Sequence, residues 1–322
     1  MLKAAVIGLG RIGSTLDASG TPTPLTHAGG FAAHPEFELV AVCDSDAARN
    51  RSEAKRWGTA AFASVSQAMA ETRPDVVSIC TPTETHLDTL RQVVEFHPGC
   101  VIMEKPLGPN MDSARELVRL CESREIPLLV HIPRRFIPLY ESLRRKIRNG
   151  SRAVSASIKY AKGIRHNGFH AVALMLSMFG EAQEATPLAV RRDFFPDDPT
   201  VSLHFQCERC DDVHFQALDE RLFTHFEFDV ILEDGRYTFY KDDFAALRHE
   251  VQWNEQYQCQ SLRPVGEEGT GKEQAMLELL NHAADMIRNG TPSCCDGRFA
   301  LKVQAMCEAI LDHVQDNDHA DH

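Results

Sequence analysis

Glu104 and Lys105 are an acid and an amine placed side by side where they could do chemistry together. They directly follow the apolar run Val101–Met103 and precede Pro106. A continuous apolar run is typical of a buried parallel strand, and ligands in open α/β sheets bind outside the carboxyl ends of the strands. Pro106 fixes φ and ends the strand. The pair is therefore predicted to lie beside a bound cofactor, with a surface ion pair at a strand end as the alternative.

A glycine pattern near the start of the chain predicts where the phosphates of such a cofactor bind. Leu2–Ile7 is a short apolar strand, and Gly8, Gly10 and Gly13 follow it as G-x-G-x-x-G. These glycines permit a tight turn, close approach of the backbone to a pyrophosphate, and close helix packing. The next helix offers free N–H groups and the positive end of its dipole.

The second strand ends in an acid that selects the type of dinucleotide. Residues 14–26 contain one glycine and two prolines and are predicted to be an inserted loop, which delays the next helix to about residues 27–34. The strand Phe37–Cys43 then ends at Asp44, and the insertion explains why more than about 20 residues separate this acid from Gly13. An Asp here accepts hydrogen bonds from ribose hydroxyls and repels a 2′-phosphate. We therefore predict NAD rather than NADP.

The neighbouring loops at the same edge of the sheet carry further candidates. The strand 75–80 ends at Thr81 and Pro82, beside the loop that holds Glu104. His86 falls in the first turn of the following helix, where it is either a structural histidine or a contact of the nicotinamide. A last strand, 128–131, completes this alternation of strands and helices, which is typical of a doubly wound parallel sheet.

The pattern becomes strand-rich after residue 132. Five strands are expected, at 154–159, 201–207, 213–218, 224–232 and 236–240, followed by helices at about 272–288 and 298–314. Such a run predicts a mostly antiparallel sheet with an open face that could bind a partner subunit. The predicted fold is α/β, with a Rossmann domain over 1–132 and an α+β domain for substrate binding and oligomerisation over 133–322.

His166 and His170 are four residues apart, so they share a helix face. A metal site would need further ligands, and no neighbouring carboxylate or cysteine is evident. The alternatives are two ordinary helix histidines, or a role in substrate binding or proton transfer. Residues 134–165 also carry ten basic residues against one acid. This run is either a solvated helix face or a surface that attracts an anionic substrate.

Composition narrows the class of protein. The 322 residues are 43% apolar and 25% charged, as in a globular protein of two domains. No apolar run approaches the roughly 20 residues that span a bilayer, and no secretory signal is evident, so we expect a cytoplasmic protein. The net charge of −12 argues against nucleic acid as a partner. Cys207 and Cys210 form a C-x-x-C whose only further pair is Cys294 and Cys295, so we expect no metal.

Together these motifs resemble the glucose-fructose oxidoreductase, inositol dehydrogenase and rhizopine-catabolism (Gfo/Idh/MocA) family. The resemblance implies a Rossmann domain, a C-terminal domain with a large sheet, homodimers or homotetramers built through that sheet, and NAD-linked oxidation of sugars or cyclitols. It also assigns roles. The cofactor-binding residues are Gly8, Gly10, Arg11, Ile12, Gly13, Asp44, Thr81, Pro82, His86, Glu104 and Lys105. Independently of the resemblance, the predicted substrate-binding residues are Arg134, Arg135, Arg165, Asn167 and His170.

The resemblance makes Lys105 the catalytic lysine and His170 the active-site histidine. The family pattern D-x-G-x-H-x-x-D is altered here, since His166 and Ala173 replace the two acids. His166 is therefore a third candidate catalytic residue. A free lysine has a pKa near 10.4, so Lys105 needs burial or a nearby cation to act as a base at neutral pH.

The segments 27–31, 81–86 and 162–170 resemble a branch of the family that acts in surface-sugar biosynthesis. This resemblance implies oxidation of the 3-hydroxyl of UDP-N-acetylglucosamine to the ketone, in cell-surface glycan or lipid A biosynthesis. A dehydrogenase of a free sugar or inositol is the first alternative. A non-catalytic NAD-binding regulator is the second.

Overall fold

The chain forms two compact units. The structure is a computed structural model that describes residues 1–17 and 23–320, with side chains up to residue 315. The first unit contains residues 1–136 and 273–302, and the second contains 137–272 and the segment from 303 onward. Residues 273–302 thus return to the first unit, although the sequence analysis places them in the C-terminal domain. The functional division between residues 132 and 133 stays a prediction.

The first unit is built on a parallel six-stranded sheet in the order β3-β2-β1-β4-β5-β6. Its strands are β1 (Leu2–Ile7), β2 (Phe37–Cys43), β3 (Ala60–Phe62), β4 (Val76–Ile79), β5 (Cys100–Met103) and β6 (Leu128–Val130). The central strands are buried on both faces, which explains their unbroken apolar sequences. The predicted Rossmann topology is confirmed, and the strand order reverses between β1 and β4, where such sheets bind ligands.

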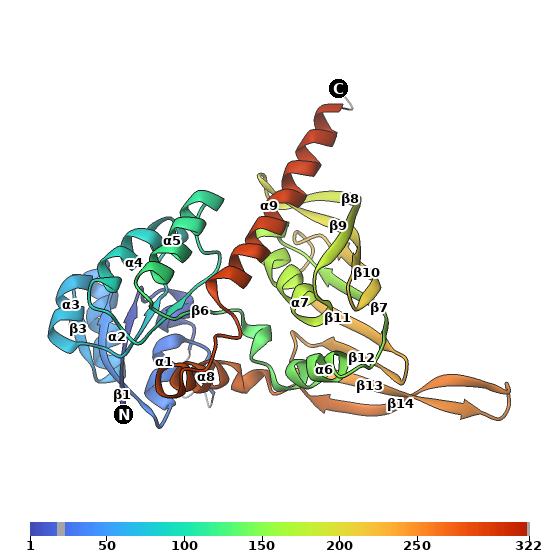
Figure 1. The fold of residues 1–322 in the computed structure, drawn as a ribbon, viewed down its shortest axis with the longest axis horizontal. Coiled ribbons are helices and arrows are strands. Elements are labelled where there is room, and N and C mark those ends of the chain that lie inside the picture. The colour runs from blue at the N-terminus through green and yellow to red at the C-terminus, as the bar shows by residue number, and fades with distance from the viewer. Residues whose placement is uncertain (18–22, 321–322) are drawn as a thin grey trace. The chain divides into compact units, whose positions relative to one another are not determined.

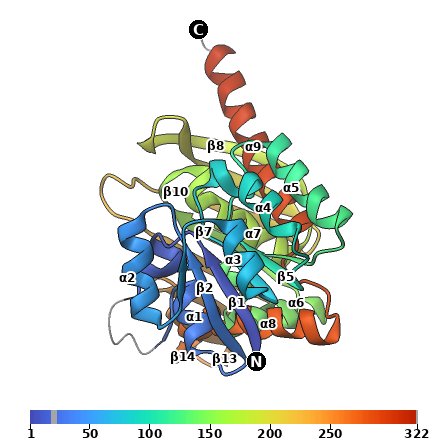
Figure 2. The ribbon, with the colours of Figure 1, turned by 90° about the vertical axis from the view of Figure 1, so that its left-hand side faces the viewer.

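Helices cover both faces of this sheet. The helices are α1 (His27–Ala33), α2 (Ala47–Trp57), α3 (Val65–Thr72), α4 (His86–Val94), α5 (Met111–Ser123) and α8 (Ala275–Asn289). Helices α3, α4 and α5 pack in a row on one face, whereas α1 contacts α2 and α8 on the other (Figure 2). Side chains of Asp46, Ser64 and Asn110 accept backbone hydrogen bonds at the starts of α2, α3 and α5. These caps fix the helix starts at the carboxyl edge of the sheet.

The predicted insertion after the glycine loop is held by a buried acid. One helical turn covers Arg11–Thr15, residues 18–22 lie outside the described part of the chain, and α1 starts at His27 as expected. The Asp17 carboxylate accepts hydrogen bonds from the Leu25 amide at 2.7 Å and the Thr26 hydroxyl at 2.5 Å. Thr26 Oγ1 in turn caps α1 by accepting from the Gly29 amide at 3.0 Å. His27 is thereby fixed at the first position of the helix.

The second unit is built on an eight-stranded sheet in the order β14-β13-β12-β11-β7-β10-β9-β8. Its strands are β7 (Ala153–Tyr160), β8 (Ala182–Phe195), β9 (Asp198–Cys207), β10 (Cys210–Ala217), β11 (Phe226–Leu232), β12 (Gly235–Tyr240), β13 (Ala245–Asn254) and β14 (Cys259–Gly269). Only β7 and β10 pair in parallel, so the predicted mostly antiparallel sheet is confirmed. Strands β13 and β14 form a long hairpin that extends beyond the rest of the sheet (Figure 1).

The two faces of this sheet differ in polarity. One face carries the buried side chains of Phe205, Phe215 and Phe228. Tyr140 of α6 (Pro138–Arg148) stacks on Phe239 with ring centroids 4.1 Å apart, which packs that helix on this apolar face. The mainly apolar helix α7 (Phe169–Phe179) is buried along nearly its whole length. Residues of the opposite face alternate with the buried ones and are mainly polar, as in half-exposed antiparallel sheets.

Three strands escape the sequence analysis: β8, β13 and β14. Strands β8 and β14 are the edges of the sheet, and almost all their side chains are exposed. An exposed edge strand needs no apolar alternation, so its sequence lacks the pattern used to find strands.

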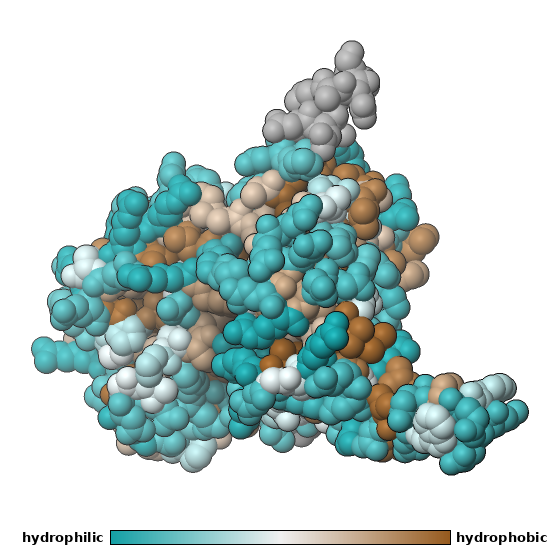
Figure 3. All heavy atoms as spheres, turned by 45° about the vertical axis from the view of Figure 1, so that its right-hand side comes forward, coloured by the Kyte–Doolittle hydropathy of each residue, from teal (hydrophilic) through white to brown (hydrophobic). Residues whose placement is uncertain are grey.

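Hydrophilic residues cover most of the face shown in Figure 3, in keeping with a chain that is 25% charged. Among the described helices, including the long α9 (Gly297–Ala320), none is long and apolar enough to cross a membrane.

Candidate active site

The glycine loop makes a tight turn with open space on one side. Gly8 has φ of +88°, and a Cβ atom there would lie 2.6 Å from the backbone of Cys80. A Cβ atom at Gly13 would lie 2.0 Å from the Gly8 carbonyl oxygen. Around Gly10, by contrast, nothing lies within 4 Å of the Cβ position. Two glycines are therefore required by packing, and the third leaves the room that a pyrophosphate needs. Arg11, which is exposed, and Ile12 begin the next turn.

Asp44 ties the second strand to the glycine loop. Its Oδ2 accepts a hydrogen bond from the Leu9 amide at 2.7 Å, and its Oδ1 accepts one from the Asp46 amide at 2.8 Å. Arg49 Nε lies 3.4 Å from Asp44 Oδ2. The sequence analysis took no account of Arg49, which lies in the first turn of α2. This arginine offsets part of the negative charge on which the preference for NAD over NADP is based.

Thr81, Pro82 and His86 lie in adjacent loops at the carboxyl edge. His86 is buried, with Nε2 3.0 Å from the Thr81 carbonyl oxygen and Nδ1 3.3 Å from the Leu107 carbonyl oxygen. Burial lowers the pKa of His86, although these carbonyls oppose the shift. The ring thus joins the loop after β4 to the loop after β5. This geometry supports a structural role, while the predicted nicotinamide contact of His86 stays a prediction.

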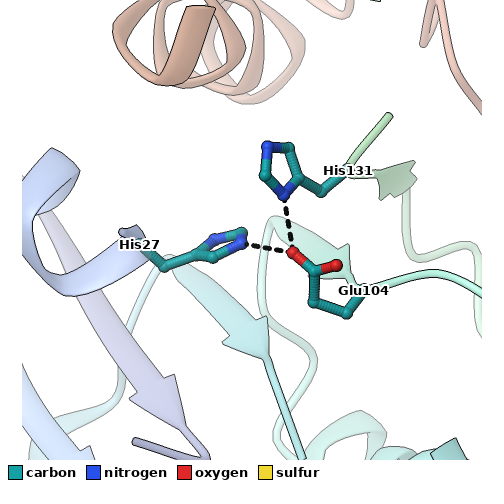
Figure 4. A group of neighbouring side chains, drawn as sticks. All are labelled: His27, Glu104 and His131. Carbon is teal, nitrogen blue, oxygen red and sulfur yellow. Dashed lines mark hydrogen bonds and ion pairs between the residues drawn. The ribbon is translucent and has the colours of Figure 1, made fainter. Parts of the chain in front are cut away.

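Glu104 is the centre of a buried cluster with His27 and His131 (Figure 4). Its Oε1 lies 3.0 Å from His27 Nε2 and 2.6 Å from His131 Nδ1. The two rings meet edge to face with centroids 4.9 Å apart. The Ser78 hydroxyl lies 3.0 Å from His27 Nδ1, so it can donate there while His27 Nε2–H donates to Glu104. Both imidazoles then converge on one carboxylate oxygen, beside the partly exposed Lys105.

The cluster keeps a carboxylate ionised in a buried place. Burial alone would raise the pKa of Glu104, but the charge of His131 and hydrogen bonds from His131 and His27 outweigh it and hold the pKa well below its usual range. Burial also lowers the pKa of His27, against the opposing hydrogen bond to Glu104. Glu104 is therefore a fixed anion and His27 a neutral donor. The separations of 2.6 and 3.0 Å are hydrogen-bond distances, although the same atoms are close enough to approach a cation together.

Sequence reasoning did not assign His27 or His131 to the site. His27 precedes Glu104 by 77 residues and His131 follows it by 27, so no local spacing joins them. A signal for His131 was present, because it directly follows β6 and strand ends in a parallel sheet share one edge. For His27 the signal was its place at the start of α1, the helix after the glycine loop.

In the second unit, a buried acid shapes the turn before α7. The Asp198 carboxylate accepts hydrogen bonds from the Arg165 amide at 2.8 Å and the His166 amide at 3.1 Å. Gly163 has φ of +76°, and a Cβ atom there would lie 2.1 Å from Asp198 Oδ2. The turn runs over 163–168, leaving the His166 ring exposed and Asn167 and His170 partly exposed. His170 then stands in the first turn of α7, whereas His166, expected on the same α-helix, lies in the preceding π-helical turn.

Several basic residues of the run over 134–165 are paired with acids of the chain. Arg165 makes a two-pronged ion pair with Glu308, at 2.8 and 2.5 Å, and its NH1 donates to the Asp197 carbonyl oxygen. Arg144 is fully buried and bonds Glu141. Acids distant in the sequence pair with Lys146 (Asp234, 2.6 Å) and Lys159 (Glu227, 2.5 Å). The interpretation of this run as a surface for an anionic substrate therefore loses its main support.

Arg134 and Arg135 lie in the first unit, directly after β6. Arg135 donates from NH2 to the Cys294 carbonyl oxygen at 2.7 Å, and its guanidinium lies 5.6 Å from the centre of the Phe299 ring. Its predicted role as a substrate ligand would compete with these contacts. Arg134 is partly exposed beside it, and the substrate role of both residues stays a prediction.

Comparison with known proteins agrees with the geometry of the first unit. Residues 2–132 match the family model GFO_IDH_MocA, described as an oxidoreductase family with an NAD-binding Rossmann fold. The resemblance to this family therefore covers residues 2–132. The prediction made from the glycine loop, Asp44 and the Glu104 loop is confirmed, and so is NAD as the type of cofactor that the fold binds.

Curated relatives resemble the same part of the chain. The D-glucoside 3-dehydrogenase of Escherichia coli K12 is 30% identical over 151 residues, which is 46% of this chain and 40% of that protein. The UDP-N-acetylglucosamine 3-dehydrogenase of Acidithiobacillus ferrooxidans is 30% identical over 143 residues, 44% of this chain and 41% of that protein. The chain thus spans about two fifths of the length of these relatives.

A likeness to solved structures extends over both units. An NAD-binding oxidoreductase of Klebsiella pneumoniae superposes with a TM-score of 0.77, covering 96% of this chain and 95% of that one. Its sequence identity is only 15%, so this likeness concerns the fold alone. The C-terminal sheet is therefore part of the shared fold, although the family model matches residues 2–132 alone.

Proposed function

We propose that this protein is an NAD-dependent dehydrogenase that oxidises a secondary hydroxyl of a sugar to a ketone. The observation that carries the proposal is the ionised Glu104 and adjacent Lys105 at the carboxyl edge of a Rossmann sheet, level with an open glycine loop. NAD supplies the carbon that accepts the hydride. The residues fit it, because Gly10 leaves space for the pyrophosphate and the Asp44 carboxylate stands at the end of β2 for the ribose.

In this proposal Lys105 takes the proton from the substrate hydroxyl, and the buried cluster positions the loop that carries it. The Glu104 backbone donates to the Ile79 carbonyl oxygen at 3.1 Å, and His131 donates from its backbone to Met103 at 2.8 Å. Two side-chain bonds from the imidazoles then fix the carboxylate. Because proton transfer requires a donor and acceptor within hydrogen-bond reach, such a fixed loop favours catalysis. His170 and His166 remain proposed catalytic residues, with His170 orienting the substrate hydroxyl.

For the substrate, we propose the 3-hydroxyl of a glucose-configured hexose, with UDP-N-acetylglucosamine as the first compound to test. The names of both relatives support this choice, since each is a 3-dehydrogenase of such a sugar. The nucleotide is supported by one of these names and by the sequence segments 27–31, 81–86 and 162–170. It is no longer supported by the basic run, whose arginines and lysines bond acids of the chain.

The experiment measures NADH formation at 340 nm with four substrates: UDP-N-acetylglucosamine, N-acetylglucosamine, a methyl glucoside and myo-inositol. Each is tried with NAD and with NADP. The proposal expects turnover with at least one hexose, and a preference for the UDP-sugar supports the nucleotide. Turnover of myo-inositol alone would favour a cyclitol dehydrogenase instead.

Lys105→Met tests the assignment of the base. Turnover should fall by about 100-fold or more, since general acid–base catalysis typically contributes 10²–10⁴-fold. Binding of NAD, followed by quenching of tryptophan fluorescence, should persist. Lys3→Met is the matched control, because Lys3 is exposed at the opposite, amino end of the same sheet and should leave turnover unchanged. Binding of NAD without turnover of any tested polyol by the unaltered protein would favour a non-catalytic NAD-binding regulator.

A further inference from the structure

A second histidine–carboxylate–histidine cluster lies on the open face of the C-terminal sheet. His204 of β9 and His214 of β10 are directly opposed across the two antiparallel strands, with ring centroids 4.8 Å apart. Asp212 stands two residues before His214, and side chains two apart on a strand share a face. The neighbouring residues Phe205 and Phe215 point into the apolar core. Three potential metal ligands therefore project together from one polar face.

The distances combine one hydrogen bond, between His214 and Asp212, with a longer separation to His204 that a metal ion could bridge. Asp212 Oδ1 lies 2.8 Å from His214 Nε2 and 3.4 Å from His204 Nε2. The second distance is longer than the usual 2.7–3.2 Å range of a hydrogen bond. In a tetrahedral zinc site with bonds of about 2.0–2.1 Å, neighbouring ligand atoms lie about 3.3 Å apart. The three ligand atoms already lie within 4.8 Å of one another, so small side-chain rotations would complete the triangle.

The backbone and a further side chain hold the carboxylate in place. The strand pairing shifts by one residue between Cys210 and Val213, which is a bulge that contains Asp212. Bulges commonly re-aim a side chain at functional places. Ser155, on the adjacent strand β7, forms a hydrogen bond with the Asp212 side chain. The arrangement provides a carboxylate ligand with an outer hydrogen-bond partner, as metal sites do.

From this geometry we propose that His204, Asp212 and His214 bind a divalent transition-metal ion of the zinc class. Two imidazoles and one carboxylate suit Zn²⁺, and imidazole also suits Ni²⁺ and Cu²⁺. The three side chains are 27%, 46% and 39% exposed, so an ion can enter from solution and a fourth position is left for water. The site belongs to the second unit alone and is independent of the proposed dehydrogenase chemistry.

Zinc titration of the metal-free full-length protein by isothermal calorimetry tests the proposal. The chain has fifteen histidines, so each variant is compared with the unaltered chain under the same conditions. His204→Ala, His214→Ala and Asp212→Asn should each remove one equivalent of bound zinc. His225→Ala and Asp211→Asn are matched controls, because both are exposed or half-exposed residues of the second unit outside the three proposed ligands and should keep that equivalent.

Asp212→Asn is isosteric, so a loss of zinc binding in this variant is not expected to come from misfolding. Circular dichroism checks that each variant is folded. Ni²⁺ should compete for the same equivalent. If all three ligand variants bind as much zinc as the unaltered chain, the proposal is overturned. The same is true if the two controls lose the equivalent to the same extent as the ligand variants.

Discussion

Two clusters in this molecule share the same composition, two histidines around one carboxylate oxygen, but differ in burial. In the first unit, His27, Glu104 and His131 are almost fully enclosed. In the second, His204, Asp212 and His214 are each between a quarter and a half exposed. Burial makes the first a set of short hydrogen bonds around a fixed anion. Exposure leaves the second open to ions from solution. The same residue types therefore serve positioning in one place and ligand capture in the other.

The serine that contacts each cluster also differs in burial between the two clusters. A serine contacts each one: Ser78 is fully buried behind His27, and Ser155 is half-buried beside Asp212. In the buried cluster an unmet polar group would cost free energy, so every contact contributes to folding. In the exposed cluster water replaces any lost partner, and the contacts matter mainly for affinity. The two clusters thus predict opposite responses to matched substitutions.

The largest contrast is expected in turnover. Glu104→Gln removes the buried anion beside Lys105 and should lower kcat/KM by about 100-fold, within the range of general acid–base effects. Asp212→Asn makes the equivalent change in the exposed cluster and should leave kcat/KM unchanged. Both are measured by NADH formation with the substrate found for the unaltered protein. Equal activity of the two variants would show that the Glu104 cluster has no part in catalysis.

The next contrast concerns stability against pH. The pKa of buried His27 is lowered by burial, so between its usual value of about 6.5 and its lower value in the folded state, the unfolded chain binds more protons. The stability contributed by neutral His27 is therefore fully present above about pH 6.5 and declines as the pH falls. Glu104, whose pKa is also lowered, adds a further loss of the same sign only below about pH 4.3.

His27→Gln should accordingly be less stable than the unaltered protein at pH 7.5, by about 1–2 kcal/mol for a broken buried hydrogen bond. The difference should shrink at pH 5.5, because the unaltered protein has lost part of its advantage. Urea unfolding at both pH values measures it. His214→Gln, without zinc, should differ from the unaltered protein by less than about 0.5 kcal/mol at either pH. A His27→Gln difference that stays constant or grows towards acid would contradict this account.

The sequence analysis could find features that depend on local patterns. The strand Val101–Met103, the glycine loop and Asp44 were identified because burial and turn geometry leave marks on consecutive residues. The partnership of Glu104 with His27 could not be found in this way, since it depends on how distant segments fold together. The acidic partners of the basic run could not be found from local patterns either. Its partners, among them Asp234 and Glu308, lie tens to more than a hundred residues further along the chain.

The smallest contrast is between the two serines. Ser78→Ala removes the hydroxyl 3.0 Å from His27 Nδ1 and should destabilise the protein by about 1 kcal/mol, the usual net value of a buried hydrogen bond. Ser155→Ala should change stability by less than about 0.5 kcal/mol but weaken zinc binding about tenfold, as expected for loss of an outer partner of a metal ligand. Urea unfolding and zinc calorimetry on both variants measure the four quantities. Ser78→Ala should leave zinc affinity unchanged. If instead Ser155→Ala destabilised the fold and spared the affinity, burial would not be what separates the two clusters.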